Sequence, residues 1–202
     1  IMTQVFNRDC MEAMREFPDK FFELAIVDPP YGIGEKLVNG GTWARERKSE
    51  YSEWDKVPNP EYFNELFRVS EHQIIWGGNY FDLPPCRCFI VWDKPQMRIP
   101  TMADCEFAWT SFDSVAKIAS ILQEKGKERI HLAQKPIALY KWLLKNYAKP
   151  GDKILDTHLG SGSSRIAADQ MGFDFWGYEL DKDYFEASVK RFNQYKAQTV
   201  LF

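Results

Sequence analysis

The C-terminal quarter of the chain constrains the fold most, because strand-like and helix-like segments alternate there with little between them. The residue pattern predicts a buried strand at 153–155, a helix at 163–171, a second strand at 175–178 and a second helix at 183–195. Strands that alternate with helices form units whose strands run parallel and are covered by helices. We therefore expect an α/β fold with a mostly parallel, twisted sheet and helices on both faces.

The rest of the chain extends this pattern. Residues 22–27 form a nearly continuous apolar run, which is typical of a strand buried on both faces of a parallel sheet. Asn59 and Pro60 suit the N-cap and first position of a helix. Further strands are predicted at 3–7, 74–76, 88–92 and 105–109, and further helices after Cys10 and at 136–147. We find no interdomain linker, so the 202 residues are expected to form one domain.

Composition and charge exclude several classes of protein. Hydrophobic residues make up 45% of the chain, which is enough for a packed core and too much for a disordered chain. The formal net charge is −3, so contact with nucleic acid must come from a local basic patch. No apolar run is long enough to span a membrane and no secretory signal is seen, so we expect a cytoplasmic protein without a membrane partner. The 4 cysteines include no CxxC pair and there are only 3 histidines, so we expect no metal.

A glycine-rich turn follows the strand predicted at 153–155. Residues 156–162 read DTHLGSG and precede a helix, so the glycines permit a sharp turn and the helix start offers free N–H groups. Glu179 ends the next strand, at the spacing where an acid binds the ribose hydroxyls of a nucleoside cofactor. Arg165 replaces the third glycine of a dinucleotide fingerprint, which favours a nucleoside cofactor. A tight turn beside a surface glutamate is the competing interpretation.

A second motif, Asp28-Pro29-Pro30-Tyr31, ends the buried strand at 22–27, where ligands bind in open α/β sheets. The prolines restrict the backbone, so the Asp28 carboxylate and the Pro29 carbonyl can be held side by side as two acceptors. Such a pair suits an amino group with two hydrogens to donate. The Tyr31 ring offers a surface on which a planar base stacks. A proline turn that leaves a strand is the simpler alternative for this motif alone.

The combined motifs resemble those of a known family. Besides DPPY, the chain contains QKP at 134–136, LD at 155–156, LGSG at 159–162 and GYELD at 177–181. This set is similar to that of the DNA amino-methyltransferases, which methylate adenine N6 or cytosine N4 with S-adenosylmethionine. Its order resembles the β class, in which DPPY precedes the cofactor-binding half. In this family DPPY points to adenine, whereas cytosine-N4 enzymes more often begin the tetrapeptide with Ser.

The resemblance implies a single Rossmann-like methyltransferase domain, residues 1–202, with a circularly permuted motif order. The implied parts are a catalytic half at about 1–112, a short target-recognition segment at about 113–134 and a cofactor-binding half at about 135–202. Read from residue 153 through the C-terminus and then from residue 3, successive strands would carry the glycine turn, Glu179, Asp9 and Asp28.

The resemblance also implies the site residues. The catalytic residues would be Asp28, Pro29, Pro30 and Tyr31. The residues that bind S-adenosylmethionine would be Asp9, Cys10, Asp28, Lys135, Asp156, His158, Gly160, Ser161, Gly162, Ser163, Glu179 and Leu180. Asp28 and the Pro29 carbonyl would accept both N–H bonds of the target amine and aim its lone pair at the sulfonium methyl, without a covalent enzyme intermediate. Lys135 would border the methionine end of the cofactor, and His158 stands where the family commonly has Phe.

DNA is the implied partner. Because an amine inside a duplex is out of reach, the base would be flipped out or already single-stranded. The candidate DNA contacts come from a long loop predicted at 32–58, from a strand end, and from the basic segment 117–135: they are Arg45, Arg47, Lys48, Lys94, Lys125, Lys127 and Arg129. Solvated, salt-bridged segments are the alternative, and for Trp92 and Lys94 the alternative is a core tryptophan beside a surface ion pair.

Several functions remain open from the sequence. The short segment after Trp109 leaves little room for target recognition, so we expect weak or very short sequence specificity, or a second subunit that completes it. A homodimer is plausible by resemblance. The competing activities are methylation of cytosine N4, RNA or protein glutamine, nucleotide-dependent redox chemistry, and nucleic-acid binding without catalysis. Neither of the last two accounts for DPPY together with Glu179.

Overall fold

The computed structural model describes residues 1–33, 55–95, 103–123, 130 and 134–199. The strands in these ranges are β1 (Thr3–Asn7), β2 (Phe22–Val27), β3 (Ser70–Trp76), β4 (Phe89–Asp93), β5 (Cys105–Thr110), β6 (Lys117–Ser120), β7 (Lys153–Asp156) and β8 (Asp174–Glu179). The helices are α1 (Cys10–Met14), α5 (Pro60–Val69), α6 (Ile137–Tyr147), α7 (Ser163–Met171) and α8 (Lys182–Thr199), with a short 3-10 helix η2 (Gly78–Tyr80). None of these helices is both long and apolar enough to cross a membrane.

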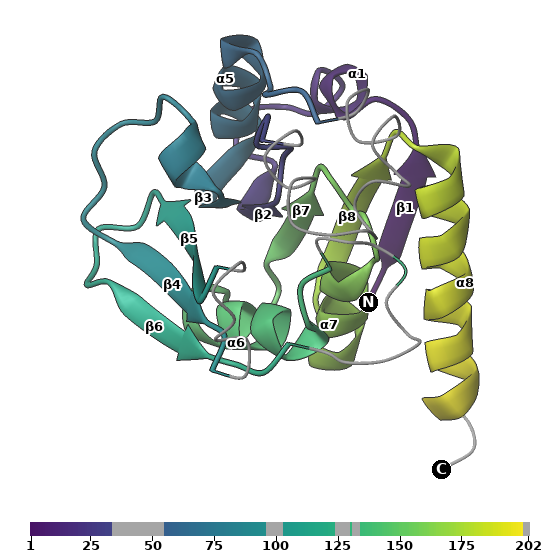
Figure 1. Ribbon diagram of the computed structural model, residues 1–202. Coiled ribbons are helices and arrows are strands. Elements are labelled where there is room, and N and C mark those ends of the chain that lie inside the picture. Colours follow the sequence, from purple (N-terminus) through teal and green to yellow (C-terminus); the bar gives the residue numbers. More distant parts are fainter. Residues whose placement is uncertain (34–54, 96–102, 124–129, 131–133, 200–202) are drawn as a thin grey trace.

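The described strands form one eight-stranded sheet in the order β1-β8-β7-β2-β3-β5-β4-β6. Strands β1, β8, β7, β2 and β3 are parallel neighbours, β5 runs antiparallel between β3 and β4, and β6 is parallel to β4. The predicted mostly parallel α/β fold is confirmed. The sheet also brings together the first and the last strand in the sequence, because β1 lies beside β8, with α8 next to this edge (Figure 1).

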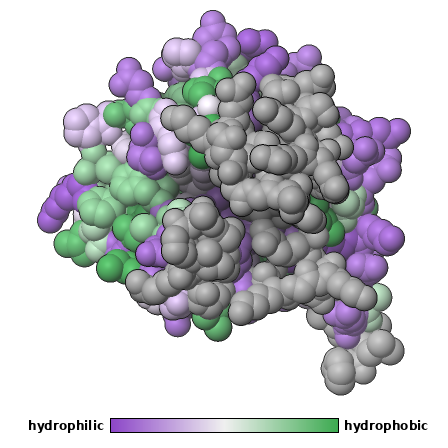
Figure 2. All heavy atoms as spheres, in the orientation of Figure 1, coloured by the Kyte–Doolittle hydropathy of each residue, from purple (hydrophilic) through white to green (hydrophobic). Residues whose placement is uncertain are grey.

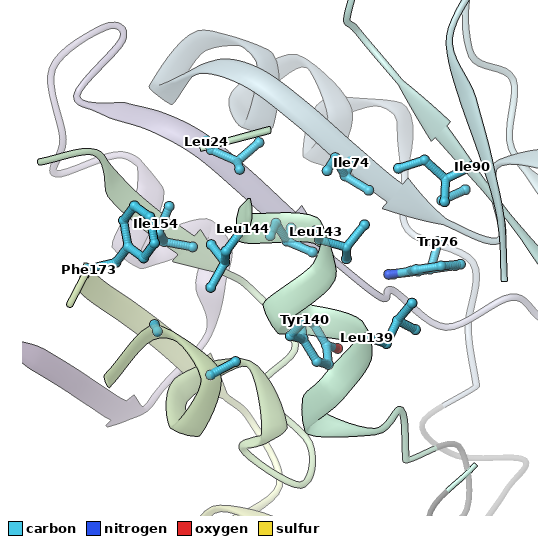
Figure 3. Packing of buried hydrophobic residues seen from close by; sticks show 14 of the residues in the cluster. Leu24, Ile74, Trp76, Ile90, Leu139, Tyr140, Leu143, Leu144, Ile154 and Phe173 are labelled. Atoms are coloured by element: carbon cyan, nitrogen blue, oxygen red, sulfur yellow. The ribbon is translucent and has the colours of Figure 1, made fainter. Parts of the chain in front are cut away.

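Helices cover both faces of the sheet, because successive residues of a strand point to opposite sides. Leu24 and Ile74 lie in the cluster that includes residues of α6 and α7, and Ala25 and Ile75 lie in the cluster that includes residues of α1 and α5. Figure 3 shows Leu143 of α6 against the first of these faces. Strand β2 is therefore apolar along most of its length because both of its faces are covered.

Most of the predicted elements are confirmed. The Asn59 side chain accepts the Tyr62 N–H at 3.0 Å, and Pro60 begins α5, as its cap sequence predicts. The helix expected after Cys10 is present but only 5 residues long. Two elements were not predicted, β6 and η2. Strand β6 lies within the expected recognition segment and at the sheet edge, where Ile118 is 69% exposed, so it lacks the apolar run by which buried strands are recognised.

Hydrophilic and hydrophobic side chains occupy different parts of the surface. In Figure 2, hydrophilic side chains cover α5 and α8, whereas hydrophobic ones gather on the side of β4 and β6. The exposed apolar side chains on or beside these two strands are Phe89, Val115, Ile118 and Leu122.

Candidate active site

The two sequence motifs leave neighbouring strands at the same edge of the sheet. Strands β2 and β7 are parallel, with Leu24 opposite Ile154 and Ala25 opposite Leu155. Asp28 and the glycine turn at 157–162 therefore both follow the carboxyl ends of adjacent strands. In open α/β sheets this edge binds ligands. The chain thus brings together two motifs that lie near its opposite ends.

The glycine turn has a buried carboxylate behind it. Gly160 and Gly162 have φ angles of 50° and 72°, in the left-handed region that favours glycine. Asp156 is 1% exposed, and its two oxygens accept the His158 backbone N–H at 3.0 Å and the Ser164 hydroxyl at 2.5 Å. Burial raises the pKa of Asp156 to about 7, although both hydrogen bonds act to lower it. The Asp156 side chain therefore holds the start of the turn and the first turn of α7 together through these two hydrogen bonds.

Glu179 lies beside the turn, at the end of β8. Its carboxylate accepts the backbone N–H of Gly160 at 2.8 Å and that of Asp181 at 3.0 Å. Burial raises the pKa of Glu179 against the effect of these bonds. Each oxygen has a further lone pair with which it can accept a hydroxyl. The neighbouring Leu180 is 73% exposed, so an apolar surface lies next to this acceptor.

The end of β1 completes this side of the site. The Asn7 amide donates to the carbonyls of Glu179 and Leu180 at 2.9 and 3.1 Å, which ties the ends of β1 and β8 together. Asp9 follows as the N-cap of α1 and accepts the Met11 N–H at 2.7 Å. Burial, and then the charge of Asp9, raise the pKa of Cys10 to about 12, so Cys10 stays a neutral thiol. The thiol is therefore a poor nucleophile.

The hydroxyls of the turn face the protein interior. The Ser161 and Ser163 hydroxyls lie 3.1 Å apart and are buried, and Arg191 donates to the Ser163 hydroxyl at 2.8 Å and to the Ser161 carbonyl at 3.1 Å. These hydrogen bonds hold the two side chains against Arg191 at the start of α7. Contact of Ser161 and Ser163 with the cofactor stays a prediction.

His158 is neutral in the folded chain. Its Nδ1 lies 2.9 Å from the Thr157 hydroxyl, which in turn lies 2.7 Å from the Tyr62 hydroxyl. Burial lowers the pKa of His158 to about 4, so the imidazole carries no charge at neutral pH. The ring packs edge-on against Tyr62, at 5.5 Å between centroids. His158 therefore contributes ring packing and one hydrogen bond. The ring packing is a role that a Phe at this position would also fill.

Asp28 has a donor on each of its two oxygens. The Tyr31 hydroxyl donates to Oδ1 at 2.5 Å, and the Lys135 ammonium donates to Oδ2. Lys135 is 3% exposed, and its Nζ also lies 3.1 Å from Oε2 of Glu106. Burial alone would lower the pKa of Lys135, but the charges of Asp28 and Glu106 outweigh it and raise this pKa. Lys135 therefore stays charged and fixes the Asp28 carboxylate.

The Tyr31 ring is held by residues that the sequence analysis missed. It stacks on Tyr80 of η2 with 5.0 Å between centroids and 17° between planes. Gly77 has a φ of 68°, and a Cβ placed there would lie 2.2 Å from Cε1 of Tyr31. Tyr80 is 46% exposed, so the stack continues to the surface. The pair Gly77-Gly78 after a strand is the signal that would have identified this close approach.

Lys94, one of the predicted DNA contacts, lies in an ion pair. Lys94 is 8% exposed, and its Nζ donates to Glu106 at 2.5 Å and lies 4.7 Å from the Trp92 ring centroid. Trp92 is 1% exposed, which agrees with the alternative of a core tryptophan beside an ion pair, and within that pair Glu106 keeps 27% of its side chain exposed. A DNA contact by Lys94 stays a prediction. The other DNA contacts expected from the sequence lie outside the described residues: Arg45, Arg47, Lys48, Lys125, Lys127 and Arg129.

The comparison with protein families decides the identity. The family model described as DNA methylase, for N6 and N4 methyltransferases, matches residues 72–190, more than half of the chain. The chain belongs to the DNA methylase family. The match covers the glycine turn, Glu179, Lys135 and Glu106, and it begins beyond the Asp28–Tyr31 tetrapeptide.

Individual DNA methylases show the same relationship. The chain is 24% identical over 217 residues to a protein named putative methylase YubD from Escherichia coli (strain K12), covering 94% of this chain and 90% of the relative. Its fold is similar to that in a crystal structure of an M1.HpyAVI–SAM complex, with a TM-score of 0.66 and 19% identity over 94% of this chain and all of that one. It is also similar to the PvuII cytosine-N4-specific DNA methyltransferase, with a TM-score of 0.62 and 13% identity over 95% and 87% of the two chains.

Membership of the DNA methylase family sets the class of reaction. The family uses S-adenosylmethionine as methyl donor and acts on DNA, and its members modify an exocyclic amine, N6 of adenine or N4 of cytosine. The structural neighbours include a cytosine-N4 enzyme, so the fold alone does not distinguish the two bases.

Proposed function

We propose that this DNA methylase transfers the methyl group to N6 of adenine, on a base that is rotated out of the duplex or lies in single-stranded DNA. The observation that carries the proposal is Asp28, an oriented carboxylate at the edge of the sheet, beside the glycine turn. Asp as the first residue of the tetrapeptide, in place of Ser, favours adenine over cytosine.

The residues present fit S-adenosylmethionine. Glu179 offers carboxylate oxygens to ribose hydroxyls, the exposed Leu180 offers an apolar surface to the adenine ring, and Asp28 places a negative charge on the same edge as these groups. Asp9 at the start of α1 and the backbone of Gly160–Gly162 are the further proposed contacts of the cofactor. When bound, S-adenosylmethionine supplies an electrophilic methyl group.

The chain's own residues would activate the amine. Asp28 and the Pro29 carbonyl accept the two N–H bonds of the amine, which favours a pyramidal nitrogen whose lone pair points away from them. Tyr31 and Lys135 use one lone pair on each Asp28 oxygen, and the remaining lone pairs stay available to the substrate. Asp28 is then the nearest base for the proton that the methylated nitrogen releases. Positioning and electrostatics supply the rate enhancement.

The test compares two identical substitutions. Asp28→Asn keeps the shape of the side chain but turns an acceptor into a donor, so we expect the rate of methyl transfer to DNA to fall by about 10²-fold or more. Asp19→Asn is the matched control, because Asp19 forms an exposed pair with Arg68 and precedes β2, at the end of this strand opposite to Asp28, and it should keep the wild-type rate. Equal rates in both variants would exclude Asp28 as the catalytic acceptor.

Analysis of the methylated bases identifies the target. Random-sequence DNA and random-sequence RNA are each incubated with labelled S-adenosylmethionine, and we expect N6-methyladenine in the DNA. N4-methylcytosine would establish the alternative base, and methylation of RNA alone would establish an RNA enzyme. Mapping the modified adenines tests the short or incomplete recognition proposed for this chain, since a strict motif longer than four bases, read by the isolated chain, would contradict it.

A further inference from the structure

Behind Asp28, four side chains of alternating charge form a continuous row. We call Asp28, Lys135, Glu106 and Lys94 the charged row. Lys135 bonds to Asp28 and lies 3.1 Å from Glu106 Oε2, while Lys94 bonds to Glu106 Oε1 at 2.5 Å. Both lysines are less than 10% exposed. The carboxylates are partly exposed, with 17% of the Asp28 side chain and 27% of the Glu106 side chain accessible. The row therefore extends from the candidate catalytic carboxylate and buries its two ammonium groups.

Strand geometry places these groups together. Glu106 of β5 lies opposite Trp92 of β4, and Lys94 directly follows β4. Ala108, two residues after Glu106, belongs to the cluster on the α6 face, as do Trp76 and Trp92. Side chains two apart on a strand share a face, so Glu106 and Lys94 point toward α6.

Lys135, two residues before α6, closes the row. Its Nζ lies 5.1 Å from the Trp76 ring centroid, and Trp76 packs beside Leu139 of α6 (Figure 3). The Trp76 ring thus lies within cation–π distance of the ammonium, in addition to the two carboxylates.

Burying the ammonium groups of the charged row costs desolvation free energy. Removing an ion from water costs several kcal/mol even after relaxation, and apolar residues of similar volume often replace buried ion pairs without loss of stability. Burial raises the pKa of Glu106, but Lys135 and Lys94 reverse this effect and lower it, so the carboxylate remains ionised. Each charge in the row is thus balanced by its neighbour, and stability alone does not account for the arrangement.

We propose that Glu106 and Lys94 are positioning residues for methyl transfer, which act through Lys135 to hold the Asp28 carboxylate in the orientation that the target amine requires. This inference rests on the proposed role of Asp28. Glu106 holds the Lys135 ammonium between two carboxylates, so Lys135 bonds to Oδ2 of Asp28 alone and leaves Oδ1 to Tyr31. Lys94 in turn holds Glu106 in place.

Without Glu106, Lys135 has one carboxylate to pair with. We expect the ammonium to move onto Asp28 and compete with the amine for its lone pairs. In Glu106→Gln, kcat should therefore fall by about 10-fold, while KM for S-adenosylmethionine changes by less than about 2-fold. Glu65→Gln is the matched control, because Glu65 is also ion-paired, with Arg68 on α5, and lies away from Asp28 on the other face of the sheet; its kcat should stay unchanged.

A double-mutant cycle separates positioning from general damage. If Glu106 acts through Lys135, then Glu106→Gln should lower kcat by less than about 3-fold in a Lys135→Met background. Lys135→Met alone leaves Asp28 and Glu106 as facing carboxylates, so adding Glu106→Gln should also restore part of the lost stability, measured by urea unfolding. A full 10-fold additive loss of kcat, or an equal loss of S-adenosylmethionine binding, would overturn the inference.

The wild-type protein distinguishes the two levels of failure. Absence of methyl transfer to DNA by the wild type would contradict the proposed function itself. An active wild type together with an unaffected Glu106→Gln variant would contradict only the positioning role of the charged row.

Discussion

Gly77→Ala tests whether the backbone after β3 sets the position of Tyr31. Gly77 has a φ of 68° and ψ of 22°, and an added Cβ would lie 2.2 Å from Cε1 of the Tyr31 ring and 2.6 Å from its Cζ. The ring cannot move away freely, because it packs against Tyr80 and Phe81 and its hydroxyl bonds to Asp28. The substitution must therefore displace Tyr31 and break its bond to Asp28.

Two magnitudes follow from this geometry. Left-handed backbone costs an alanine about 1–2 kcal/mol in stability relative to glycine. A hydrogen bond to a charged group contributes about 1.5–3 kcal/mol, so loss of the bond between Tyr31 and Asp28 should lower kcat by about 10- to 100-fold if the bond orients the carboxylate. Gly151→Ala is the matched control, since Gly151 has a φ of 94° but no atom within 4 Å of an added Cβ.

Urea unfolding and steady-state methyl transfer, measured on both variants, separate strain from displacement. Gly151→Ala should lose about 1–2 kcal/mol of stability and keep its kcat. Gly77→Ala should lose at least as much stability, and its kcat should also fall by the predicted 10- to 100-fold, to about 1–10% of the wild-type value. If the two variants lose equal stability and both keep the wild-type kcat, then the contact between Gly77 and Tyr31 has no part in orienting Asp28.

Three simpler predictions concern stability and reactivity. Burial lowers the pKa of His158 from 6.5 to about 4, so between these pH values the unfolded chain binds a proton that the folded chain does not. The free energy of unfolding should therefore fall by about 3 kcal/mol as the pH falls from 6.5 to 4. Urea unfolding of His158→Phe at the two pH values should lack this fall. Leu143→Ala, in the core, should cost about 2–5 kcal/mol, and Leu122→Ala, at 64% exposure, less than about 0.5, by the same method. A thiol reagent should label the exposed Cys105 well before Cys10, whose pKa is raised to about 12, as peptide mapping would show.

The meeting of the two motifs could be predicted because it depends on local signals and one topological rule. The apolar runs of β2 and β7 identify strands buried on both faces, and parallel strands end at the same edge of the sheet. Asp28 and Gly160 each directly follow such a strand or its turn, so the sequence alone places both at that edge. The cap at Asn59 and the spacing between Gly160 and Glu179 could be predicted for the same reason, because each depends on one short stretch of sequence.

The charged row could not be predicted, because its members are distant in the chain and each is ordinary in its own segment. Lysines and glutamates are mostly exposed, so Lys94 and Lys135 suggest surface contacts when they are judged from composition. Glu106 occurs in the strand sequence CEFAWT, where alternation allows either a solvent-facing or a buried position. The burial of the two lysines results from pairing with Glu106 across β4, β5 and the start of α6, which only the folded chain brings together.

This difference changes how the DPPY motif should be understood. From the sequence, Asp28 is a free acceptor that two prolines hold in place. In the fold, both of its oxygens already accept a hydrogen bond, one from Tyr31 and one from Lys135, and those donors in turn contact Gly77 and Glu106. The prolines can set the direction of the backbone, but the rotation of the carboxylate depends on these two donors. The substitutions that best examine catalysis are therefore outside the tetrapeptide, where orientation can be altered while the acceptor itself is retained.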